Sequence, residues 1–168
     1  MLSIAFAFLA TSVAEQMAPA KKGLLQCQSP IGSTKTCDSI SRVTQVSSGS
    51  YRFENEILID ADGPVILLER AIATVQGNKL CETVRLAEID KFAIFINGKP
   101  ATSAERARYR ANIKEKFAPI AGRTICTSVV PDEDGLQTVE ASISGQRLPI
   151  LDYTMKWVGP NDGWKVAP

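Results

Sequence analysis

The chain has 168 residues, of which 45% are hydrophobic and 22% charged, and its 19 basic and 18 acidic side chains leave a net charge of +1. A chain of this length and composition is typical of one globular domain with a hydrophobic core, not of a disordered protein. The balanced charge gives no long-range field that would attract nucleic acid. The absence of histidine excludes Ser-His-Asp and Cys-His catalysis and histidine-based zinc sites.

The amino terminus predicts a signal peptide over residues 1–14. An apolar run at 2–10 precedes small residues at 12–14, which is typical of a cleavage site, so Glu15 would begin the mature chain. The Lys or Arg that usually precedes the apolar run is missing. The run is too short to span a bilayer, which takes about 20 residues. We expect an exported protein, periplasmic or secreted, that is not an integral membrane protein once the signal is cleaved.

Four cysteines agree with export: Cys27, Cys37, Cys81 and Cys126. An even number in a secreted chain favours disulfides, whereas zinc sites usually pair cysteines roughly two to four residues apart and often add histidine. Four cysteines permit three pairings. We predict Cys27–Cys37, because the short loop closes easily, and Cys81–Cys126, which would join a strand on each side of the main helix.

Residues 15–40 are expected to form an N-terminal lead-in that carries the first two cysteines, and residues 41–168 a single domain. From Ser41 onward, Val- and Thr-rich stretches and alternating apolar and polar side chains predict strands separated by turns. Residues 65–76 fit either a helix or a strand, and their β-branched side chains favour strands. The strands expected in this half cover 42–47, 51–59, 65–76, 79–84 and 91–96.

The clearest helix covers residues 102–117. Thr102 and Glu105 form a capping box, and Tyr109, Ile113 and Phe117 line one face. The later strands are expected at 123–130, 136–143, 150–158 and 164–167. Strands, one helix and then an antiparallel meander predict the α+β class: a mostly antiparallel sheet packed against one main helix at about 102–118 and stapled by disulfides.

Glu54 and Glu56 are weak candidates for catalysis. They lie on the same face of an expected strand, about 6.7 Å apart, which falls in the range of the paired carboxylates of glycosidases. Charged residues also alternate along many exposed strands, so a solvated face is the favoured interpretation.

No metal site and no cofactor are expected. The chain contains neither a P-loop nor a G-x-G-x-x-G motif. Asp60 and Asp62, and separately residues 132–134, place carboxylates in Gly-containing loops. Neither loop has the spacing of a calcium loop, and the preference of Asp and Gly for turns explains both.

Two groups of side chains are weak candidates for binding. Arg106, Arg110 and Lys114 form one row on the predicted helix, where they could dock an acidic partner or a phosphate-bearing polymer. Tyr153, Trp157 and Trp164 lie in the last hairpin and could stack on a sugar or fill a pocket of a partner. The favoured alternatives are a solvated helix face for the row and a core beneath the helix for the aromatic side chains.

The sequence carries no complete functional motif. It fits best with a non-catalytic exported binding protein whose partner is another envelope protein or a glycan and not nucleic acid. The alternative is a histidine-free hydrolase that uses Glu54 and Glu56 on an envelope glycan.

Overall fold

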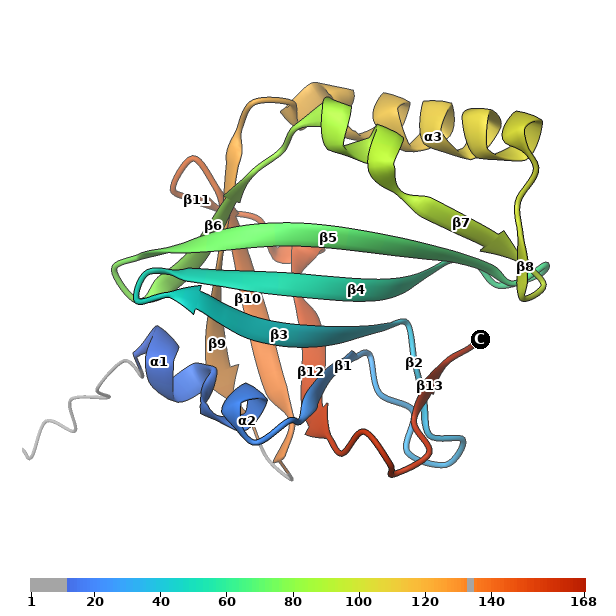
Figure 1. Cartoon of the computed structure of the whole chain (residues 1–168). Coiled ribbons are helices and arrows are strands. Elements are labelled where there is room, and N and C mark those ends of the chain that lie inside the picture. Colours follow the sequence, from blue (N-terminus) through green and yellow to red (C-terminus); the bar gives the residue numbers. More distant parts are fainter. Residues whose placement is uncertain (1–11, 133–134) are drawn as a thin grey trace, which may run out of the picture.

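The protein is a closed β-barrel with helices at its margins (Figure 1). The computed structural model describes residues 12–132 and 135–168. In these ranges eight antiparallel strands make up the barrel. The barrel strands are β1 (Leu25–Gln28), β3 (Ser39–Ser47), β4 (Ser50–Asp60), β5 (Val65–Gln76), β6 (Lys79–Thr83), β9 (Thr124–Pro131), β10 (Gln137–Ile143) and β12 (Tyr153–Val158).

The β4–β5 ladder closes the sheet on itself. The strands follow the order β4-β3-β1-β12-β10-β9-β6-β5, and the long β4–β5 hairpin joins the two ends of this series. The short strand β1 pairs with β3 on one side and β12 on the other, so it links the first hairpin to the C-terminal meander. The stretch at 15–40 therefore supplies a wall of the barrel as well as two of the cysteines.

The expected α+β class is wrong. The alternation of side chains shows that each strand has one apolar face, and we expected the helix to cover that face. Instead the sheet curls until its own apolar face is enclosed, as the strand order shows. The long helix α3 (Ser103–Phe117) has no buried residue. Closure also leaves the barrel strands without free edges, which an open sheet packed on one helix would expose.

One end of the barrel is closed by two short helices, α1 (Val13–Gln16) and α2 (Ala18–Lys21). Val13 is 3% exposed and Met17 only 1%. Both belong to an apolar cluster that reaches into the barrel. The other buried members of this cluster are Val43, Tyr51, Ala73 and Leu80. The helices thus seal the end at which these inward side chains gather. The predicted cleavage after residue 14 falls inside α1 and would remove Val13, so in the mature chain Met17 and α2 would form this seal.

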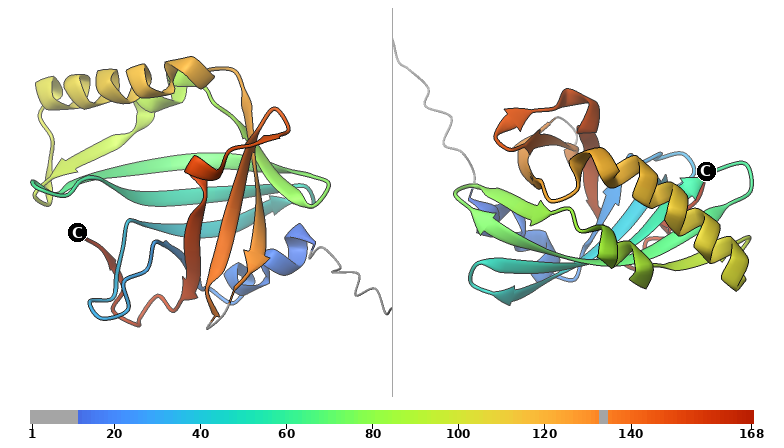
Figure 2. Two further views of the ribbon diagram at one scale, coloured as in Figure 1. Left: turned by 180° about the vertical axis from the view of Figure 1, so that it is seen from behind. Right: turned by 90° about the horizontal axis from the view of Figure 1, so that it is seen from above.

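Beyond the other end, the β4–β5 hairpin extends past the barrel. The last residues of β5 pair with β6 and the first with β7 (Ala93–Ile96), which in turn pairs with β8 (Lys99–Pro100). Helix α3 lies along this extension, as the view from above shows (Figure 2). Its Tyr109 packs against a small core of Val65, Ile94 and Ala101.

The remaining elements are short. They are the 3-10 helices η1 (Leu86–Lys91), η2 (Ala118–Ile120) and η4 (Pro149–Leu151) and the strands β2 (Thr36–Cys37), β11 (Gln146–Arg147) and β13 (Lys165–Val166). β13 pairs in parallel with β2 and so ties the C-terminal segment to the first disulfide loop. None of the helices in the described ranges has the length and apolar character needed to cross a membrane.

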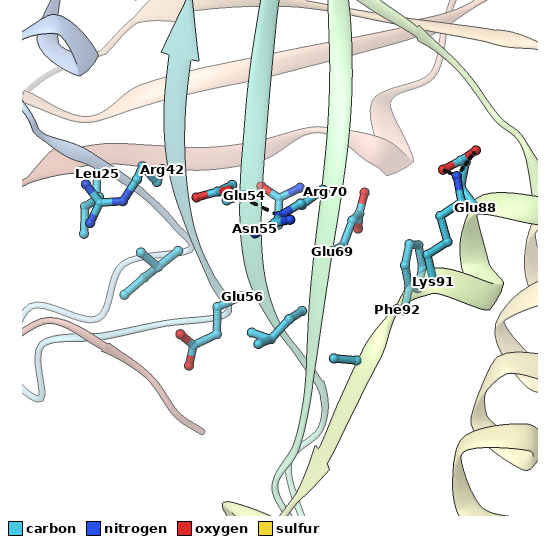
Figure 3. A pocket seen from close by; sticks show the side chains of 13 residues that line it. Leu25, Arg42, Glu54, Asn55, Glu56, Glu69, Arg70, Glu88, Lys91 and Phe92 are labelled. Carbon is cyan, nitrogen blue, oxygen red and sulfur yellow. Dashed lines mark hydrogen bonds and ion pairs between the residues drawn. The ribbon is translucent and has the colours of Figure 1, made fainter. Parts of the chain in front are cut away.

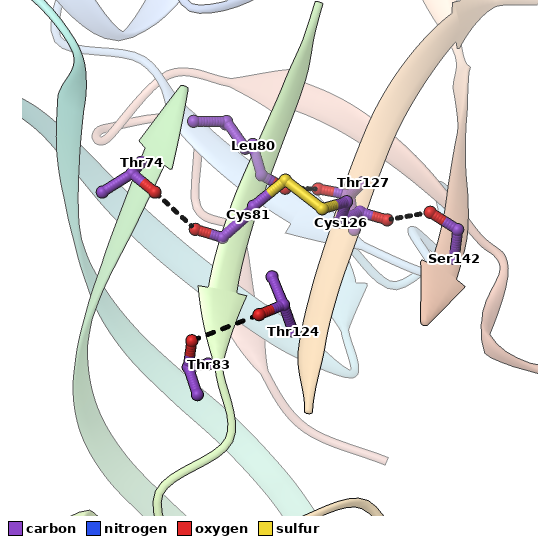
Figure 4. Close-up of a disulfide and its surroundings, with 8 residues drawn as sticks. All are labelled: Thr74, Leu80, Cys81, Thr83, Thr124, Cys126, Thr127 and Ser142. Atoms are coloured by element: carbon purple, nitrogen blue, oxygen red, sulfur yellow. Dashed lines mark hydrogen bonds between the residues drawn. A yellow bond between two sulfur atoms is a disulfide. The ribbon is translucent and has the colours of Figure 1, made fainter. Parts of the chain in front are cut away.

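Both predicted disulfides are confirmed. Cys27–Cys37 closes a short loop outside the barrel, where Val158 and Trp164 pack against it. Cys81–Cys126 joins directly opposed residues of β6 and β9, and the Thr74 and Ser142 hydroxyls donate to the backbone carbonyls of its two cysteines (Figure 4). With sequence separations of 10 and 45, chain entropy gives the bridges about 3 and about 4 kcal/mol. Two such bonds indicate an oxidising compartment.

Most expected elements are present. Residues 65–76 form a strand, as favoured, and α3 has the predicted Thr102–Glu105 capping box. The strands expected at 91–96 and 150–158 are shorter, because each begins with a 3-10 turn instead. The apolar run of the expected leader, at 2–10, lies outside the described residues.

The buried position of Met17 leads to a test of the seal at the barrel end. Met17→Ala should lower the free energy of unfolding by about 2–4 kcal/mol, because it leaves a cavity in the apolar cluster. The exposed Lys21 on the next helix provides a control, and Lys21→Ala should change this free energy by less than about 0.5 kcal/mol. Urea unfolding measures both. Equal stability of Met17→Ala and the unsubstituted protein would show that the helices do not seal the barrel.

Candidate functional site

A row of polar side chains faces the interior of the barrel. Gln26 on β1 lies opposite Ser41 on β3, Ser41 lies opposite Asn55 on β4, and Asn55 lies opposite Glu69 on β5. Directly opposed residues in antiparallel strands point to the same face. The row therefore runs across four neighbouring strands on their enclosed side, where a packed barrel would carry apolar residues.

These side chains line a cavity of about 230 Å³ within the barrel. The polar residues of its lining are Gln26, Gln28, Ser39, Ser41, Asn55, Glu69, Glu82, Thr127 and Tyr153. The apolar residues are Phe53, Ile57, Ala71, Ala73, Leu80 and Ile125. The lining contains no Lys or Arg. The cavity is thus amphipathic, and its only charged groups are acidic.

Two carboxyl groups share this space. Burial, and then the nearby charge of Glu82, raise the pKa of Glu69 to about 7, although a hydrogen bond from the Asn55 side chain acts in the opposite direction. Burial also raises the pKa of Glu82. Tyr153 lies near Glu82, and burial together with that charge raises its pKa to about 12. Near neutral pH the site therefore holds a neutral phenol and carboxyl groups that resist ionisation.

Several polar atoms of the interior lack a partner among the described residues. The buried Asn55 Oδ1 accepts no hydrogen bond, although the amide of the same side chain donates to Glu69. Gln137 Oε1 and Trp157 Nε1 are likewise buried and unpaired. By contrast, the Ser39 hydroxyl donates to Gln28 Oε1 at 3.0 Å. Unpaired buried polar atoms are costly and few in native proteins. Of these three residues only Asn55 lines the cavity, so its oxygen is the unpaired atom that a ligand in the cavity could bind.

Glu54 and Glu56 lie on the opposite, outer face of the barrel wall. They line a groove of about 770 Å³ formed by β1, β3, β4, β5, η1 and β7, and Asn55 and Glu69 of the inner cavity belong to its lining as well (Figure 3). Glu54 forms a salt bridge of 3.2 Å with Arg70, and both side chains are exposed. Glu56 lies between Ile40 and Leu68 of the neighbouring strands. The structure thus places both carboxylates in the same groove, but on a wall open to solvent.

The three basic side chains of the α3 row already bind other groups of the same chain. Arg106 donates to the Ala101 carbonyl, and Arg110 Nη2 donates to the Phe92 carbonyl at 2.6 Å. Lys114 forms a salt bridge of 2.7 Å with Asp90. The contacts of Arg110 and Lys114 fasten α3 to the segment between β6 and β7, whereas that of Arg106 is local to the start of the helix. They give the row a structural role, and docking of an acidic partner stays a prediction.

The three aromatic candidates do not form one surface. Tyr153 lines the cavity, and Trp157 packs against the apolar cluster at the sealed end. Trp164 packs outside the barrel, against the Cys27–Cys37 disulfide. The hairpin face that carries Tyr153 and Trp157 is part of the barrel interior and not a layer beneath the helix.

No group of three or more His, Cys, Asp or Glu side chains within 12–132 and 135–168 is arranged to hold a metal ion. Asp60 forms a local turn, because its Oδ1 accepts from the backbone amide of Asp62. In the second acidic loop, residues 133 and 134 lie outside the described residues.

Comparison with known proteins assigns no family: neither a protein-family model, a curated protein nor a solved structure matches the chain.

Sequence reasoning missed Glu69, Glu82 and Asn55 and found Tyr153 for a different reason. A signal was present, since Asn55 alternates in phase with the apolar Tyr51, Phe53 and Ile57. A polar residue in phase with the apolar face of a strand faces the same side as the core.

The raised pKa of Glu69 predicts how stability depends on pH. Between about pH 4.5 and 7 the folded protein keeps a proton that the unfolded chain releases, so the free energy of unfolding falls as the pH rises through this interval. Glu69→Gln should match the unsubstituted protein at pH 5 and exceed its stability by about 2–3 kcal/mol at pH 8. Thermal unfolding across this range measures the difference.

The control is Glu54→Gln on the outer face, which should leave the pH dependence unchanged. If Glu69→Gln kept the same decline of stability from pH 5 to pH 8, Glu69 would not be the buried acid that the structure indicates.

Proposed function

We propose that this protein is an exported, non-catalytic binding protein that holds a small molecule inside its barrel. The observation that carries the proposal is the inward polar row from Gln26 to Glu69 beside a cavity of about 230 Å³. Barrels of eight strands are either filled by their own side chains or hold one small ligand. Polar groups kept in such an interior at a cost to folding support the second case.

Export is supported by two features. The two disulfides fit an oxidising compartment, and the N-terminal sequence has the pattern of a cleaved signal. We therefore propose that the protein works in the periplasm or outside the cell.

The other predicted partners receive less support. An envelope protein or a glycan would meet the outer surface, where Arg106, Arg110 and Lys114 already bind the protein's own backbone and Asp90. The hydrolase alternative rests on Glu54 and Glu56, and the salt bridge of Glu54 to Arg70 does not favour it. A ligand inside the barrel is the function that the geometry supports best.

Filling the cavity tests the proposal without knowledge of the ligand. Ala71 lines the cavity opposite Phe53, so Ala71→Phe should occupy the space that the ligand needs. The purified protein is incubated with a small-molecule extract of its host and examined by native mass spectrometry. The unsubstituted protein should carry an added mass that is released on denaturation, and Ala71→Phe should lose it.

The matched control is Ile72→Phe, because Ile72 is the next residue of β5 and is 57% exposed on the outer face. This variant should keep the added mass. Thermal unfolding checks that each variant is folded. If Ala71→Phe does not fold, Ala71→Leu replaces it, because leucine fills part of the same space with a smaller side chain. No added mass on the unsubstituted protein, or the same mass on folded Ala71→Phe, contradicts a binding site inside the barrel.

A further inference from the structure

We infer that the ligand of the barrel is a small organic cation: a protonated amine attached to an apolar body. The inference rests on the proposed function and specifies its ligand. It follows from three properties of the cavity, which are its two acidic groups without a basic partner, the unpaired acceptor Asn55 Oδ1, and its apolar and aromatic lining.

The ionisable groups of the cavity are all acidic, and none is basic. The titratable groups that face it are Glu69 from β5, Glu82 from β6 and Tyr153 from β12. The lining residues from β1, β3, β4 and β9 are uncharged. Arg70, the neighbour of Glu69 in the chain, binds Glu54 on the outer face. A cation in the cavity would therefore supply the counter-charge that the lining residues do not, and it would favour the ionised carboxylates.

The hydrogen-bonding groups favour the same ligand. Ionised carboxylates only accept hydrogen bonds, and the buried Asn55 Oδ1, which lacks a partner among the described residues, is a further acceptor. An ammonium group has three donors and no acceptor. One ammonium group could thus satisfy Asn55 Oδ1 and the carboxylates together, whereas an anion would add further acceptors.

The apolar side chains and the volume of the cavity indicate the chemistry and size of the remainder of the ligand. Phe53, Ile57 and Ile125 offer apolar contact, and the rings of Phe53 and Tyr153 can attract a cation over their faces. A cavity of ~150 Å³ binds benzene. The present volume of about 230 Å³ is half as large again. It therefore suits a ligand of roughly nine non-hydrogen atoms.

A metal ion fits this lining less well than an amine. Calcium takes about six to eight oxygen ligands, whereas apolar side chains form much of the lining. No cluster of three or more acidic, cysteine or histidine ligands occurs in the described parts of the chain. We therefore commit to an organic cation and keep calcium as an outcome of the test.

The experiment compares three probes of one shape: 2-phenylethylamine, the neutral 2-phenylethanol and the anion phenylacetate. Isothermal titration calorimetry is run on the disulfide-bonded protein at pH 7.5. The amine should bind at least tenfold more tightly than the alcohol, and phenylacetate should not bind. Glu69→Gln and Glu82→Gln should each weaken the amine at least tenfold and leave the alcohol within twofold, whereas Glu54→Gln on the outer face should change neither.

The pH dependence gives a second readout. A carboxyl group with a pKa of about 7 predicts that amine affinity falls about eightfold from pH 7.5 to pH 6, because binding must then displace a proton. Over this interval the amine itself remains protonated. Glu69→Gln should abolish most of the change, and titrations in buffers of different ionisation enthalpy should detect the released proton.

The outcomes separate the two proposals. If the alcohol binds as tightly as the amine and Ala71→Phe blocks both, the barrel is a ligand site but the ligand is not a cation. If Glu69→Gln and Glu82→Gln leave amine binding unchanged, or if calcium binds and excludes the amine, the inference is overturned. If none of the probes binds, the inference is also overturned, and the added mass lost in Ala71→Phe decides separately whether the barrel holds another ligand.

Discussion

Pairing of β1 with both β3 and β12 is the contact on which the rest of the structure depends. Without it, the N-terminal hairpin and the C-terminal meander would be parts of one open sheet, with β3 and β12 as exposed edges. Closure satisfies the backbone groups of those edges and encloses one face of every barrel strand. The disulfide at Cys27 fastens the end of β1 to the loop that leads into β3. A strand of only four residues thus decides what is interior and what is surface.

Closure also has a cost, because it encloses polar groups together with apolar ones. At the sealed end, the interior is filled by Met17, Tyr51 and their neighbours. Farther along, Asn55, Glu69 and Glu82 remain beside a cavity, and no basic residue lines it. Burial then raises the pKa of both carboxyl groups, which favours their neutral forms. The barrel interior therefore has two parts: an apolar end that stabilises the fold, and a polar cavity whose lining is suited to a ligand.

The long helix illustrates the same division on the outside. Since the barrel covers its own apolar face, α3 has little apolar surface to bury, and Tyr109 is its contact with a small core. Hydrogen bonds and a salt bridge from Arg106, Arg110 and Lys114 hold it in place instead. A row of basic side chains that resembles a docking surface in the sequence is in large part an attachment to the neighbouring segment.

The sequence by itself determined the alternation of the strands and the capping box at Thr102. It favoured a strand at 65–76 and the pairing Cys27–Cys37 with Cys81–Cys126, but it left the alternatives to both open until the tertiary structure decided them. The local features follow from interactions between near neighbours, which spacing along the chain reveals. Only the tertiary structure decided that the sheet closes and that Glu69 faces inward while Glu54 faces outward. Alternation assigns residues to two faces of a strand, but contacts between strands distant in sequence decide which face is enclosed and which carboxylates share a cavity.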